Sequence, residues 1–168
     1  MSDWKDAYAA SSAVTISPAA TPLASSATFV AVRESTLVDN TTNLYENYLL
    51  AGKITTGTSP TTGKEIRIGV VGLMEDSTWP DVFDGVDSDE TITSVDIMNS
   101  IVKWVATIST DSTSNRTYPF GPVGIAAAFN YELPKKFVVV VSHSTGVALN
   151  STAGNHAIYI TPKYKTIT

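Results

Sequence analysis

Hydrophobic and polar positions alternate along most of the chain after residue 27, and this two-residue period is that of β-strands with one buried face. Clusters of Gly, Pro, Asn and Ser separate the alternating runs, as turn residues do between strands. The pattern predicts strands over residues 28–33, 43–57, 65–75, 117–134, 135–146 and 156–168. We therefore expect an all-β domain.

Three of these runs carry further information. The stretch from Phe137 to Val141 is apolar on both faces, which predicts a central strand that is covered on both sides. Residues 117–134 are interrupted by prolines and a glycine, which is typical of an edge or bulged strand. In the last run, Pro162 is expected to end the strand.

One stretch has the period of a helix. Between residues 94 and 108 the apolar side chains recur three or four positions apart, so that they share one helical face. Thr93 precedes the stretch and has the chemistry of an N-cap residue. We expect a helix over 94–108 that lies over one face or end of the sheets, although the many Val and Ile residues would also suit a strand.

The number and spacing of the strands predict a two-sheet antiparallel β-sandwich, jelly-roll-like, over residues 28–168. Residues 1–27 lack a sustained period and are rich in Ala and Ser, so we expect an extended N-terminal arm. A flexible tail is one interpretation of this segment, but solvated linkers seldom carry much apolar surface, so we expect its apolar side chains to order against a neighbouring subunit. The predicted partner-binding residues of the arm are Trp4, Tyr8, Val14 and Ile16.

Composition narrows the classes of partner and site. The net charge is −5 and the 11 Lys and Arg residues are scattered, so no basic stripe exists and we expect no nucleic-acid partner. No run approaches about 18 uninterrupted apolar residues, so we expect no membrane partner. The chain has no Cys, which excludes disulfides and thiolate metal sites.

The densest charge cluster is acidic and spans residues 75–90. Ca²⁺ takes roughly six to eight oxygen ligands, so an oxygen-rich loop of this kind is a candidate ion or ligand site. The candidate residues are Asp81, Asp84, Asp87 and Asp89. Their spacing does not match the EF-hand loop, and a solvated loop beside the start of the predicted helix is the alternative.

Catalytic patterns are weak. In the sequence SHSTG (142–146), Ser142 stands where a nucleophile elbow requires Gly, and no helix is predicted after it. The two histidines, His143 and His156, have no clustered third ligand, so a zinc site is not expected. We expect no catalytic residue, no metal and no cofactor, and a protein that is not an enzyme.

The segments VDNTTNLY, TYPFGPV, LPKKF, TGVALN and IYITP follow one another along the chain. With them, roughly residues 30–165 resemble a family of small virion structural proteins of tailed bacteriophages. The resemblance implies a non-enzymatic decoration or cement protein on the capsid surface, often built on a β-sandwich, with the major capsid protein as its partner. Self-association as a dimer or trimer is also expected, because most such assemblies have closed symmetry.

Two other roles remain open. A carbohydrate- or receptor-binding module is one, because jelly rolls serve as lectins and the acidic loop also carries Trp79 and Phe83. A tail or head-to-tail connector subunit is the other. The fold alone does not choose among these roles.

Overall fold

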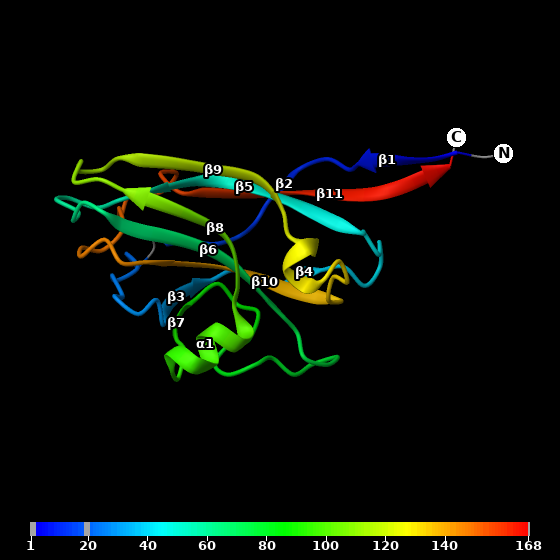
Figure 1. Ribbon diagram of the computed structural model, residues 1–168, viewed down its shortest axis with the longest axis horizontal. Coiled ribbons are helices and arrows are strands. Elements are labelled where there is room, and N and C mark those ends of the chain that lie inside the picture. Colours follow the sequence, from blue (N-terminus) through cyan, green and yellow to red (C-terminus); the bar gives the residue numbers. More distant parts are fainter. Residues whose placement is uncertain (1–2, 19–20, 168) are drawn as a thin grey trace.

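A computed structural model describes residues 3–18 and 21–167, and in it two antiparallel sheets pack face to face (Figure 1). The first sheet has the order β1-β11-β5-β9, and β2 also pairs with β11. The second has the order β7-β3-β10-β6-β8, and β4 also pairs with β10. The strands are β1 (Trp4–Tyr8), β2 (Ser12–Ala13), β3 (Ala31–Glu34), β4 (Val38–Asp39), β5 (Asn47–Thr55), β6 (Lys64–Gly72), β7 (Asp89–Thr91), β8 (Lys103–Thr110), β9 (Thr117–Gly124), β10 (Lys136–His143) and β11 (Ala157–Ile167). The helices are α1 (Val95–Ile101) and the 3-10 helix η1 (Ala126–Phe129).

The strands pair in a nested order. In the first sheet β1 lies beside β11, and β5 lies beside β9. In the second sheet β3 lies beside β10, and β6 lies beside β8. The chain therefore pairs from its two ends inward, alternating between the sheets, which is the topology of a jelly roll. The predicted all-β, jelly-roll-like sandwich is confirmed, and β9 lies at a sheet edge as expected.

Strand β10 is covered on both faces, as its sequence predicts. Phe137, Val139 and Val141 point into the core between the two sheets. Val138 and Val140 point to the other face, where α1 and the loop that precedes it cover the second sheet. All five side chains are fully buried. The second sheet thus has a core on each side, whereas no described segment covers the outer face of the first sheet (Figure 1).

The predicted helix over 94–108 is too long. Helix α1 ends at Ile101, and the rest of the segment is strand β8, which pairs with β6 along its length. The apolar spacing suits both structures, but pairing with a distant strand satisfies the backbone of β-branched residues that are poor helix formers. The N-cap is also different: Ser94 accepts the Ile97 N–H, whereas Thr93 is bound by Asp81.

Pro162 does not end the last strand, which continues to Ile167. The Pro162 carbonyl accepts the Ala9 N–H, so the backbone of Pro162 faces the N-terminal segment. An N–H at this position would face the same side, because the N–H and C=O of one strand residue point the same way. On that side the chain between β1 and β2 is not a strand. The lack of an N–H at Pro162 therefore breaks no strand–strand hydrogen bond, and β11 continues through it.

The segment before residue 27 is part of the sandwich and not a separate arm. Strands β1 and β2 pair with β11, and the Val14 N–H bonds to the Ile158 carbonyl. Val14 and Ile16 are buried in the core between the sheets. The expected division into an arm (1–27) and a sandwich (28–168) thus differs from the structure, because this segment supplies the first strand of the jelly roll.

One part of the segment does extend away from the body. Strand β1 pairs residue by residue with the end of β11, from Trp4 opposite Ile167 to Tyr8 opposite Lys163. We call this two-stranded element the ribbon; it projects past the rest of the sandwich (Figure 1). Four of the five β1 residues are exposed, so the ribbon contributes little to the core.

The double burial of β10 predicts that both of its faces stabilise the fold. We expect Val139→Ala and Val140→Ala each to lower the free energy of unfolding by roughly 2 kcal/mol, because each removes packed methyl groups. The exposed Val86 is the matched control, and Val86→Ala should change it by less than about 0.5 kcal/mol. Urea unfolding measures all three; a Val140→Ala effect no larger than the control would contradict a second core.

Candidate interaction surface

The outer face of the first sheet carries a row of large exposed side chains. Along β11, Ile158 and Ile160 point into the core, so Tyr159 and Ile167 point outward. Trp4 and Tyr8 share that face, because Trp4 lies directly opposite Ile167 in the ribbon. The exposed fractions are 65% for Trp4, 55% for Tyr8, 48% for Tyr159 and 57% for Ile167. We call these four side chains the outer-face row.

An ion pair fixes the ribbon at its base. The Lys163 ammonium lies 2.7 Å from a carboxylate oxygen of Asp6, across the two strands of the ribbon. This hydrogen bond lowers the pKa of Asp6 and raises the pKa of Lys163. The pair is partly exposed, so it adds little to the free energy of unfolding. Its main effect is to favour the observed register between β1 and β11.

The structure divides the predicted partner-binding residues. Trp4 and Tyr8 stand exposed on the outer-face row, whereas Val14 and Ile16 are buried in the chain's own core and are not available to a partner. Sequence reasoning missed Tyr159 and Ile167. Their signal was the alternation of the last strand: Tyr159 lies between the inward Ile158 and Ile160, and Ile167 falls on the same outward face once the strand is continued past Pro162.

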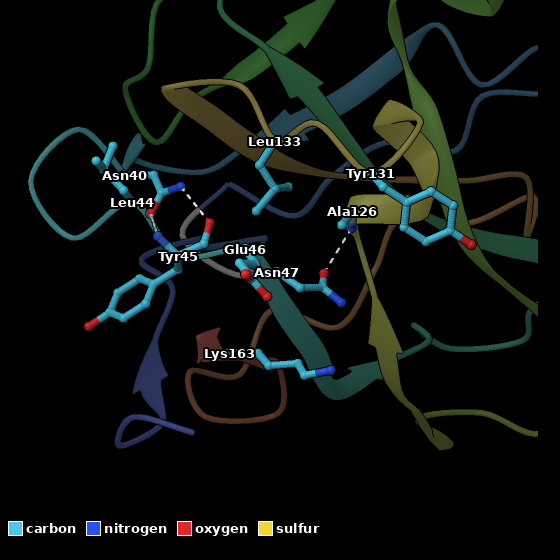
Figure 2. Close-up of a pocket in the computed structure, with 9 residues that line it drawn as sticks. All are labelled: Asn40, Leu44, Tyr45, Glu46, Asn47, Ala126, Tyr131, Leu133 and Lys163. Carbon is cyan, nitrogen blue, oxygen red and sulfur yellow. Dashed lines mark hydrogen bonds between the residues drawn. The ribbon is translucent and has the colours of Figure 1, made fainter. Parts of the chain in front are cut away.

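A hollow of about 540 Å³ lies at the base of the ribbon (Figure 2). It is lined by Asn40, Leu44, Tyr45, Glu46, Asn47, Ala126, Tyr131, Leu133 and Lys163. The Asn40 amide is committed to the fold, since it bonds the Tyr45 backbone in both directions and accepts from the Tyr48 hydroxyl. The Asn47 Oδ1 accepts the Ala126 N–H, which leaves its Nδ2 donor for the hollow.

The acidic run serves the protein's own backbone and an arginine. Asp81 accepts the N–H and hydroxyl of Thr93, and Asp84 accepts the Val86 N–H. Asp87 and Asp89 bind the buried guanidinium of Arg33, with Nε to Asp87 at 2.7 Å and Nη1 to Asp89 at 3.1 Å.

Asp81 and Asp84 therefore bind different backbone segments, and Asp87 and Asp89 bind the same guanidinium, so the four carboxylates do not converge as ion ligands would. Within residues 3–18 and 21–167, no three His, Cys, Asp or Glu side chains form a group suited to a metal ion. Asp87 also accepts the Ser17 N–H, so the acidic run holds the N-terminal segment to the second sheet.

A buried carboxyl that the sequence did not reveal lies beside this run. Glu34 is fully buried in β3 and accepts the backbone N–H groups of Asp84 and Gly85. Burial, with a smaller contribution from the nearby charges of Asp84 and Glu90, raises the pKa of Glu34 to about 7, although the two N–H donors lower it.

Both histidines are engaged by the fold. The His143 Nε2 lies 2.9 Å from the Leu23 carbonyl, which can only accept, so this nitrogen carries the proton. Nδ1 lies 2.9 Å from the Thr145 hydroxyl, and burial lowers the pKa of His143. No ring nitrogen is thus left to activate Ser144. His156 Nε2 bonds the Asn150 carbonyl.

No protein-family model matches the chain, and no curated protein matches it significantly. None of the helices in the described part of the chain is long and apolar enough to cross a membrane.

Glu34 predicts a pH dependence of stability. Its folded pKa of about 7 lies above the ordinary 4.5, so its contribution is full below pH 4.5 and is lost as pH rises through 7. We expect the free energy of unfolding of Glu34→Gln, relative to wild type, to rise by roughly 2 to 3 kcal/mol between pH 5 and pH 8.

Urea unfolding at several pH values measures this difference. The pKa values of His143 and Asp87 are also shifted, but both groups are present in both proteins and cancel in the comparison. A difference that is constant with pH would show that the Glu34 carboxyl titrates normally.

Proposed function

We propose that this chain is a non-enzymatic virion structural protein that decorates and cements the capsid of a tailed bacteriophage. Its partner is the major capsid protein, and its contact surface is the outer face of the first sheet. The observation that carries the proposal is the outer-face row, in which four large side chains stand exposed on one uncovered sheet face.

The chemistry of this row suits a protein partner. Aromatic side chains are enriched at interfaces because they bury a large area at a small cost in conformational entropy. Lys163, Lys165 and Asp6 lie among them on the same face and supply polar contacts. A cement protein presents many copies to a repeated lattice, so modest contacts of this kind add to a large avidity.

Two further points support a binding role. The resemblance to small virion structural proteins implies a capsid partner, and the β-sandwich that it implies is the architecture of the chain. The histidines and acids that suggested chemistry have structural partners inside the fold. A connector role at the tail rests on the resemblance alone.

Point substitutions test the capsid contact better than truncation, because removing residues 1–27 would remove core side chains. We expect Trp4→Ala combined with Tyr159→Ala to weaken binding to capsids at least tenfold, since both lose interface area. Leu44→Ala with Tyr131→Ala is the control, because these large side chains are at least as exposed but line the hollow and not the outer-face row. Co-sedimentation with capsids that lack the protein measures binding; equal loss in both variants, or none, would reject this face.

A saccharide-binding role is the second candidate, and the hollow in Figure 2 favours it. Glu46, Lys163 and the free amide donor of Asn47 offer polar groups there, and Tyr131 lies exposed at its rim. Sugar sites combine a few such polar groups with an aromatic face.

A glycan array followed by calorimetry separates this role from the first. If the hollow binds a saccharide, we expect Glu46→Gln and Tyr131→Ala each to weaken binding about tenfold, because each removes one contact with the sugar. Trp4→Ala, on the outer-face row, is the control and should bind normally. An array on which the protein binds no glycan would rule out this candidate.

A further inference from the structure

We propose that the free edge of β1 pairs with β1 of a second copy of this chain, antiparallel about a twofold axis, so that the first sheet continues across two copies. The outer-face row is a face of the ribbon, whereas this inference concerns its edge. It stands whether or not the proposed capsid role is right.

Backbone directions define the edge. The Ala9 N–H bonds to Pro162 on β11. Because the groups of successive residues in a strand point to opposite sides, the N–H and C=O groups of Tyr8, Asp6 and Trp4 point away from β11. No other described strand pairs with β1, and no described backbone group bonds to these three residues. The edge therefore offers an alternating row of unpaired donors and acceptors.

The ribbon has too little support within one chain. A two-stranded ribbon is marginally stable in water, and additional strands or a packed face are needed to hold it. The ribbon projects past the body, and β1 buries none of its side chains fully. Two paired ribbons would form a four-stranded sheet, in which every inner strand has neighbours on both sides.

Charge and size select the register. A twofold axis at Lys5 or at Asp6 would place like charges directly opposite each other, which is destabilising. An axis at Ala7 places Asp6 opposite Tyr8 of the second copy, and Lys5 opposite its Ala9. Ala7 is also the only small side chain in β1, and residues on the axis approach their own copy most closely.

The hydrogen-bond pattern agrees with this register. The groups of Ala7 point toward β11, so the pair at the axis is a non-hydrogen-bonded pair. The flanking pairs, Asp6 with Tyr8 of the second copy, then have outward donors and acceptors on both strands. The outward donors and acceptors of β1 can therefore pair with those of a second β1. A twofold interface requires this self-complementarity.

A proline at an outward position tests the main-chain pairing. Asp6→Pro removes one outward N–H but no bond to β11, whereas Asp6→Ala loses the same ion pair with Lys163 and keeps the N–H. We expect wild type and Asp6→Ala to have twice the chain mass of 17.9 kDa at micromolar concentrations, and Asp6→Pro to be monomeric. Light scattering after size exclusion and sedimentation velocity measure this.

A single thiol tests the register, because the chain has no cysteine of its own. Ala7→Cys should form a disulfide-linked dimer on mild oxidation, since the two thiols face each other across the axis. Lys5→Cys is the control on the same face; its two copies would lie roughly 13 Å apart along the strands and should not cross-link.

Two results would overturn the proposal. One is a wild-type protein that is monomeric at tens of micromolar, which would leave the edge to a strand of another protein. The other is an Asp6→Pro variant as dimeric as Asp6→Ala, which would place the dimer contact elsewhere. Both assays use purified protein without capsids, so their outcome is separate from that of capsid binding.

Discussion

The double burial of β10 is the constraint on which the rest of the structure depends. Its odd-numbered side chains fill the core between the sheets, and Val138 and Val140 require a second cover. Helix α1 and the loop before it supply that cover, so they are committed to the second sheet. None of the described segments covers the first sheet in this way, so its outer face is exposed. The apolar residues on both faces of β10 thus explain why the second sheet is covered on both sides and the first sheet on one.

The charged cluster at Arg33 ties three distant parts of the chain together. Its guanidinium binds Asp87 and Asp89, and Asp87 also holds Ser17 of the N-terminal segment. A buried guanidinium is tolerated when its donors are satisfied, and here carboxylates and a backbone carbonyl satisfy them. The acidic run is therefore explained by its partners within the fold.

Features that depend on neighbouring residues could be predicted from the sequence, whereas features that depend on distant pairings could not. β10 is recognisable because five consecutive apolar residues need cover on both sides. The length of α1 is not, because the spacing after Ile101 suits a helix and a strand equally, and the distant β6 decides between them. The exposure of Trp4 and Tyr8 agrees with the expectation from the sequence, but the burial of Val14 depends on β11, far along the chain. The pairing of Arg33 with Asp87 is equally non-local.

Strands β1 and β11 meet at the tip of the ribbon, which allows the strands to be connected in another order. Trp4 and Ile167 lie opposite each other, so a tight turn joining these strands would close the backbone into a circle. The loop between β10 and β11 is exposed at residues 151–154, so it offers a place to open the circle. Every strand would keep its neighbours in such a circular permutant, since a jelly roll is one long folded hairpin. The same sandwich could therefore form from a chain in which the strands follow one another in a different order.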